Sequence, residues 1–296
     1  MMVIMLVRRM TKGLRKRHSW VCPRLSATMS AQPPFLGSQI LNADEIPIKE
    51  VITYLDRHAL FAGQWQFRKS KSQSRKEYES MLCERAEPVL NYWLSRICQE
   101  SLLYPAIAYG YFPCGREGNR LTVFNPEGSH ILGYFDLPRQ RGGRRYCISD
   151  FFQDLKDGHP TDVLPMQAVT VGNQASAFSQ ELFQANAYSD YLYFHGLAVQ
   201  MTEALAEWAH ARIRQECGFG DADTMSIRDV LTQRYRGSRY SFGYPACPNM
   251  ADSRQQLDWL DTARIGLSID ASDQLQPEQS TTALISLHSR AGYFSA

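Results

Sequence analysis

The stretch that governs the fold is residues 188–217, which read YSDYLYFHGLAVQMTEALAEWAHARIRQEC. Its apolar side chains recur at helical spacing, at Tyr191, Phe194, Ala198, Met201, Leu205 and Trp208. One apolar stripe of this length predicts a long helix that buries one side against the rest of the domain.

The sequence around this helix contains shorter helical and strand patterns. We expect further helices at 47–58, 74–100, 226–235 and 253–261, with a break at Pro88. We expect strands at 107–113, 120–124, 131–135, 146–151, 166–171, 265–269 and 282–288. Because turns rather than helices separate most of these strands, the pattern favours an α+β fold with a largely antiparallel sheet flanked by helices.

The composition is that of a globular protein. The chain has 296 residues, of which 44% are hydrophobic and 21% are charged. No stretch approaches the roughly 18 apolar residues that a membrane span requires, so we expect no membrane partner. The seven cysteines are scattered, with no C-x-x-C pair, which predicts reduced thiols and a cytoplasmic location.

The charge is unevenly distributed along the chain. The net charge is +2, yet residues 1–43 carry seven basic side chains and no acidic one. The remaining residues have 25 basic against 30 acidic side chains, a charge of −5, so we expect no nucleic-acid partner. We interpret residues 1–32 as a basic, disordered tail, which is a transit peptide, a linker or an extension without function, and residues 33–296 as one folded domain.

The segment 236–248, RGSRYSFGYPACP, contains two glycines and two prolines among aromatic residues. This composition cannot continue a helix or a central strand, so we expect an ordered loop. Arg239 in such a loop can form a bidentate pair with a ligand carboxylate or phosphate, while Gly243 permits close backbone approach. A purely structural turn with a surface arginine is the alternative.

A polar stripe follows the other side of the long helix. It consists of Gln200, Glu203, Glu207, His210 and Arg214. Glu207 and His210 have the Glu-x-x-His spacing of di-iron bundles, but such bundles need a second helical copy of the motif and two more glutamates. We therefore expect no metal site, and interpret the stripe as a solvated face with i, i+4 pairs.

At these residues the sequence resembles the C-terminal activation, or reactivation, domain of cobalamin-dependent methionine synthase. The resemblance runs from about residue 33 to residue 296. Its most specific element is Arg239-x-x-x-Gly243-Tyr244-Pro245-Ala246-Cys247-Pro248. Supporting segments are WQFR at 65–68, YGYFP at 109–113, PRQ at 138–140, VTVG at 169–172, HGLA at 195–198, EALAE at 203–207 and GYF at 292–294.

The resemblance implies a C-shaped single domain that binds S-adenosylmethionine. In this family, one electron from a flavodoxin-type or other flavoprotein donor and a methyl group from S-adenosylmethionine convert cob(II)alamin to methylcobalamin. Cobalamin is supplied by a partner protein or module, and the pathway is methionine biosynthesis. By similarity, the S-adenosylmethionine ligands are Asp56, Glu203, Arg239, Ser241, Tyr244 and Tyr293, with no acid–base catalytic residue.

Two other functions remain possible from the sequence. A non-catalytic module of the same fold would only dock a cobalamin protein or a flavodoxin-type donor. A metal protein would use Glu203, Glu207 and His210. The family resemblance predicts a methyltransferase module that is active only with a cobalamin-carrying partner.

Overall fold

The computed structural model describes residues 31–220 and 226–296. The interpretation of the basic tail therefore falls almost entirely outside the described residues. Within them, no helix combines the length and the apolar character needed to cross a bilayer.

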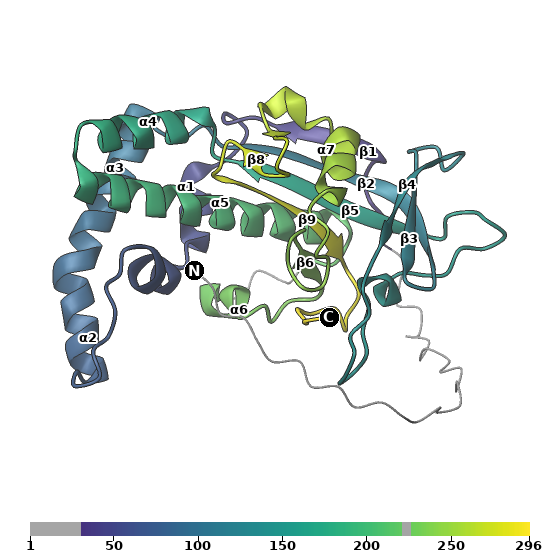
Figure 1. Ribbon diagram of the computed structural model, residues 1–296, viewed down its shortest axis with the longest axis horizontal. Coiled ribbons are helices and arrows are strands. Elements are labelled where there is room, and N and C mark those ends of the chain that lie inside the picture. The colour runs from purple at the N-terminus through teal and green to yellow at the C-terminus, as the bar shows by residue number, and fades with distance from the viewer. Residues whose placement is uncertain (1–30, 221–225) are drawn as a thin grey trace, which may run out of the picture.

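The centre of the fold is a sheet of seven strands, in the order β4-β3-β2-β5-β9-β6, with β1 paired beside β2 (Figure 1). Every pairing in this sheet is antiparallel. Its strands are β1 (Gly37–Leu41), β2 (Ala106–Glu117), β3 (Arg120–Phe124), β4 (Ile131–Asp136), β5 (Asp162–Thr170), β6 (Ser238–Tyr240) and β9 (Ser280–Ser286). A separate small ribbon pairs β7 (Ser268–Ile269) with β8 (Leu275–Gln276).

The helices lie mainly at one end of the sheet and along its faces. They are α1 (Ile48–Val51), α2 (Arg75–Met81), α3 (Glu87–Glu100), α4 (Asn173–Gln184), α5 (Tyr188–Glu216), α6 (Ile227–Leu231) and α7 (Asp252–Leu260). Shorter turns are the 3₁₀ segments Ile52–Tyr54, Ile148–Phe151 and Thr262–Ile265 and the π segments Ala59–Gln64 and Leu82–Ala86. The break expected near Pro88 is confirmed, because Leu82–Ala86 interrupts the helix and Pro88 lies in the first turn of α3.

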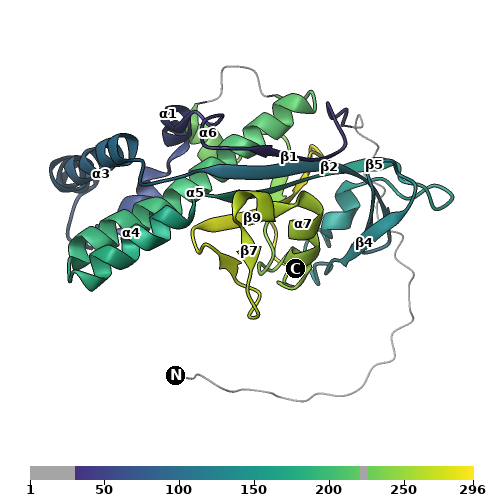
Figure 2. The same cartoon turned by 90° about the horizontal axis from the view of Figure 1, so that it is seen from above.

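The two faces of the sheet bury different cores. Ile107, Tyr109 and Tyr111 of β2 pack in one core with α5, while Ala108 and Phe112 pack in the other with α7. This alternation is the side-chain period of a strand. Figure 2 shows α7 on one side of the sheet and α1 and α6 on the other. The long helix predicted at 188–217 is thus confirmed as α5, and most of its apolar stripe is buried.

The outline is a shallow C. In Figure 1, α2 and α3 form one arm and the β3–β4 end of the sheet forms the other, on either side of α6 and the C-terminus. Together with the antiparallel sheet and the flanking helices, this confirms the predicted α+β fold.

The helices expected at 47–58 and 226–235 end early, at Tyr54 and Leu231. Three other local predictions are wrong. Residues 146–151 are not a strand: the Asp150 carboxylate accepts a hydrogen bond from the Cys147 amide at 2.9 Å and closes a 3₁₀ turn. Residues 265–269 begin in the turn Thr262–Ile265, and left-handed Gly266 leaves only β7 as strand. The segment 236–248 is not entirely loop, because Ser238–Tyr240 form edge strand β6 before the prolines begin. Helix α4 and strand β1 were not predicted.

Candidate functional site

Strand β6 determines where Arg239 points. Arg239 lies opposite Ile285 of β9, and Ile285 belongs to the core on the α5 face of the sheet. The side chain of Tyr240, the next residue, is buried in the core on the α7 face. Because neighbouring side chains of a strand alternate, Arg239 is directed toward α5.

On α5, the Arg239 guanidinium meets a buried carboxylate. Its Nη2 donates to Oε2 of Glu207 at 2.8 Å, and the Tyr235 hydroxyl donates to the same oxygen at 3.2 Å. Burial lowers the pKa of Arg239, but Glu207, Tyr235 and Glu203 raise it by more, so the net shift is upward. The Arg239 side chain keeps 18% of its surface exposed, and its charge interacts with that of Glu203.

The polar stripe of α5 is not the solvated face that we expected. Glu203 is exposed, but Glu207, His210 and Arg214 are buried. The covering group is Tyr235, whose ring lies 3.9 Å from the Arg214 guanidinium carbon and 5.1 Å from the His210 ring. A solvated polar stripe and a buried ionic stripe have the same helical spacing in a sequence. Here the stripe is buried because Tyr235, from a segment after α5, covers it.

His210 has an unusual environment. Its side chain is fully buried, and neither ring nitrogen has a hydrogen-bond partner among the described residues. Burial, Arg214 and Arg239 lower its pKa well below the ordinary value, which favours the neutral ring. Within 31–220 and 226–296, no group of three His, Cys, Asp or Glu side chains is arranged to hold a metal ion.

Asp56 lies on another segment that packs on α5. Its Oδ1 accepts a hydrogen bond from the Ala59 amide at 2.9 Å, which starts the π turn Ala59–Gln64. The turn is fixed to the long helix by Trp65, whose Nε1 donates to the Tyr193 carbonyl at 2.9 Å. No contact between Asp56 and the other predicted ligand residues is found among the described hydrogen bonds and ion pairs.

Ser241 and Tyr244 lie in the tight turn after β6. The Ser241 carbonyl accepts from the Cys247 thiol at 2.9 Å, and the Gly243 amide donates to the Cys247 carbonyl at 3.0 Å. Gly243 has φ +87°, a conformation that a side chain would strain. Tyr244 is 57% exposed, so its ring is free to contact a ligand.

The C-terminal segment returns beside β6. The Tyr240 hydroxyl donates to the Gly292 carbonyl at 3.1 Å, and the Phe294 ring packs against Tyr240. Between these two anchors, Tyr293 is 57% exposed. The structure thus brings Arg239 toward Glu203 and places Tyr244 and Tyr293 on the segments that flank β6.

Sequence reasoning gave Glu207 a role only in the metal-protein alternative, not in S-adenosylmethionine binding, and did not consider Tyr235. Glu207 lies one helical turn after Glu203, which is the only signal that the sequence offered. Tyr235 lies in the expected helix 226–235, but α6 ends at Leu231, and the residues after it turn back toward α5.

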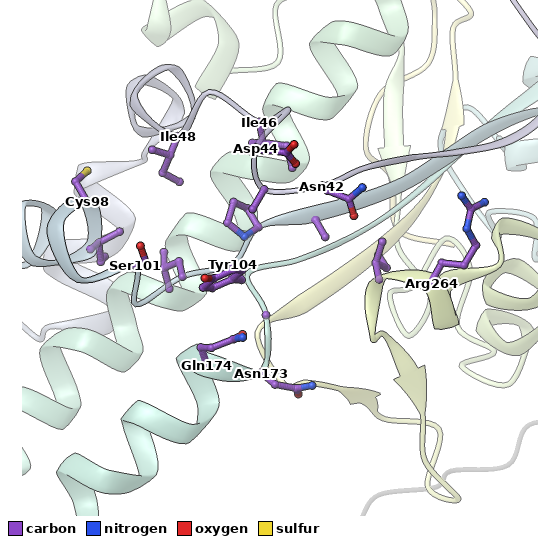
Figure 3. A pocket seen from close by; sticks show the side chains of 17 residues that line it. Asn42, Asp44, Ile46, Ile48, Cys98, Ser101, Tyr104, Asn173, Gln174 and Arg264 are labelled. Carbon is purple, nitrogen blue, oxygen red and sulfur yellow. The ribbon is translucent and has the colours of Figure 1, made fainter.

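A separate cavity of about 720 Å³ opens at the other end of the sheet (Figure 3). It is lined by the end of β1, the start of β2, the start of α4 and the turn before β7, including Asn42, Tyr104, Asn173 and Arg264. Its lining contains none of the predicted S-adenosylmethionine ligands.

Comparisons with known proteins agree with this fold. Residues 47–296 match the family model of the vitamin B12-dependent methionine synthase activation domain. The chain is 40% identical to methionine synthase of Mycobacterium tuberculosis and 41% identical to that of Mycobacterium leprae, each over 274 residues and 88% of this chain. It spans only 23% of the length of these relatives.

A solved structure shares the architecture. The crystal structure of the MetH reactivation domain bound to AdoHcy superimposes with a TM-score of 0.79, covering 90% of this chain and 83% of that one. At 22% identity this likeness concerns the fold. Since the family model covers nearly all of the described chain, the protein belongs to the family of vitamin B12-dependent methionine synthase activation domains.

Proposed function

We propose that this chain binds S-adenosylmethionine beside β6 and serves as the reactivation module of a cobalamin-dependent methionine synthase. The observation that carries the proposal is the partly exposed Arg239 side chain, whose guanidinium is held by Glu207 and feels the charge of Glu203. A carboxylate and a neighbouring cation, the pair that the amino-acid end of S-adenosylmethionine presents, match these two charges. Family membership and the AdoHcy bound to the solved structure of the same fold support the same ligand.

Each predicted ligand residue has a chemical role in this proposal. Arg239 binds the carboxylate through its planar fork. Glu203 and Asp56 supply negative charge to the ammonium and sulfonium groups. The backbone around Ser241 bonds the nucleoside, and the exposed rings of Tyr244 and Tyr293 cover it.

The reaction requires no proton transfer from the protein. The methyl group leaves the sulfonium, and the electrons of the carbon–sulfur bond remain on sulfur, which yields AdoHcy. The acceptor is cobalamin on a partner module, reduced by one electron from a flavodoxin-type or other flavoprotein donor. The chain contributes positioning of the methyl group and exclusion of water. We also propose a cytoplasmic location, which the seven scattered cysteines without a C-x-x-C pair support.

Binding is tested by calorimetric titration of the full chain with S-adenosylmethionine. Arg239→Ala removes a charge-assisted hydrogen bond of about 1.5–3 kcal/mol, so affinity should fall by about tenfold or more. The matched control is Arg234→Ala, because Arg234 is 68% exposed and pairs with Asp229 at the surface. Absence of binding by the wild type, or equal affinity in the two variants, would contradict the proposed site.

Methyl transfer is tested separately, with a cobalamin-binding module, a reductant and S-adenosylmethionine labelled in its methyl group. We expect label on cobalt only when this chain is present. Association with the cobalamin module without transfer of label would instead identify the chain as a docking module.

A further inference from the structure

Behind Arg239 lies a carboxylate that the proposed ligand does not need to touch. Glu207 is buried on α5, and its Oε2 accepts hydrogen bonds from both Arg239 and Tyr235. Its Oε1 lies 3.9 Å from Arg214 Nη1 and 3.9 Å from His210 Nδ1. Because the groups around it are buried, the Glu207 carboxylate has little freedom to turn away.

Only one end of the Arg239 guanidinium is engaged in this contact. Nη2 donates to Glu207, whereas a guanidinium has five N–H donors arranged in a plane. Nε and Nη1 are not among the buried side-chain atoms of the described residues that lack a partner, and 18% of the side chain stays exposed, so these two nitrogens can donate outward. A guanidinium already held by the protein loses less conformational freedom when it binds a second carboxylate.

The two glutamates of this part of α5 differ in their surroundings. Glu203 is exposed and interacts with Arg239 only through its charge, but Glu207 makes the close contact. Glu203 is thus available to a ligand cation, while Glu207 is committed to the arginine. With only one acidic residue, the same carboxylate would have to hold Arg239 and bind the ligand cation.

We propose that Glu207 is a positioning residue that holds one end of Arg239 so that the opposite end is presented to the carboxylate of the ligand. The proposal rests on the proposed S-adenosylmethionine site and assigns to Glu207 the preference for a ligand with a free carboxylate. Glu207 acts through Arg239 and does not touch the ligand.

The test compares two ligands by calorimetry on the full chain: AdoHcy and its carboxyl methyl ester. The wild type should bind AdoHcy at least about tenfold more tightly than the ester, as expected for a charge-assisted pair. Glu207→Gln keeps the shape but removes the charge that holds Arg239. In this variant the ratio of the two dissociation constants should shrink severalfold, through weaker AdoHcy binding.

The matched control is Glu216→Gln on the same helix. Glu216 also accepts from an arginine, Arg212, and from two tyrosine hydroxyls, those of Tyr109 and Tyr111, but it belongs to a different cluster. It should keep the wild-type ratio. A general loss of stability would lower affinity for both ligands alike, so the ratio isolates the positioning role.

The outcomes separate the two proposals. If the wild type binds AdoHcy and discriminates against the ester, but Glu207→Gln discriminates equally well, the positioning role is overturned and the proposed function stands. If the wild type binds neither ligand, the proposed function itself fails. Circular dichroism checks the fold of each variant, and if Glu207→Gln does not fold, Glu207→Asp, which withdraws the charge by one methylene, takes its place in the same comparison.

Discussion

Gly196 on α5 sets how closely the segment that carries Asp56 approaches the long helix. A Cβ atom added at Gly196 would lie 2.8 Å from the Gln64 Cβ and 3.1 Å from the Trp65 Cδ1. Trp65 is buried and bonded to α5, so its ring has little room to move. Gly196→Ala must therefore force the helix and the turn apart.

Two effects of known size oppose each other in this variant. Alanine in place of glycine inside a helix stabilises it by about 1 kcal/mol. Overpacking a filled interface costs about 1–3 kcal/mol. Gly63→Ala is the matched control, because Gly63 lies in the facing π turn with nothing within 4 Å of its added Cβ. The free energy of unfolding of Gly196→Ala should lie about 1–3 kcal/mol below that of Gly63→Ala.

Urea unfolding followed by circular dichroism measures this difference, with tryptophan fluorescence as a local probe of Trp65. The two variants should separate in denaturation midpoint with little change in slope. Equal midpoints for Gly196→Ala and Gly63→Ala would refute the reasoning, because they would show that the interface tolerates the extra methyl group.

Two further predictions concern buried charges. The pKa of His210 in the folded protein lies below its unfolded value of about 6.5, so on acidification the unfolded state takes up a proton first. The free energy of unfolding should be full well above pH 6.5 and fall by about 1 kcal/mol between pH 6.5 and pH 5.5. Urea titrations should show that His210→Gln lacks this loss. Asp150→Ala should lower the free energy of unfolding by about 3–5 kcal/mol, since it removes the buried carboxylate that pairs with Arg139 and Arg116. Asp154→Ala, at an exposed carboxylate, should cost under about 1 kcal/mol by thermal or urea unfolding.

Regular, strongly periodic elements were predictable from the sequence. The apolar stripe of α5 and the strands β2, β3 and β4 follow from hydrophobic patterns that local physics enforces. The segment 146–151 was not predictable, because its apolar residues fit a strand and only the buried Asp150, paired with distant arginines, imposes a 3₁₀ turn.

The site shows the same division. Arg239 stands out in the sequence because its neighbours include glycines, prolines and aromatic residues. Its approach to Glu203 depends on the pairing of β6 with β9 and on how the sheet packs against α5, which spacing alone cannot give. The role of Glu207 was hidden for a related reason: on a helix, a buried glutamate and a solvated one have the same periodicity. The participation of Asp56, like that of the other five predicted ligand residues, stays a prediction.

The most direct measurement for the central claim is a crystal structure of this chain with AdoHcy. The account predicts the ligand beside β6, with its carboxylate within hydrogen-bond distance of Arg239, and with Nη2 of Arg239 still bonded to Glu207. A ligand in the cavity lined by Tyr104 and Asn173, or one bound beside β6 without contact to Arg239, would contradict it.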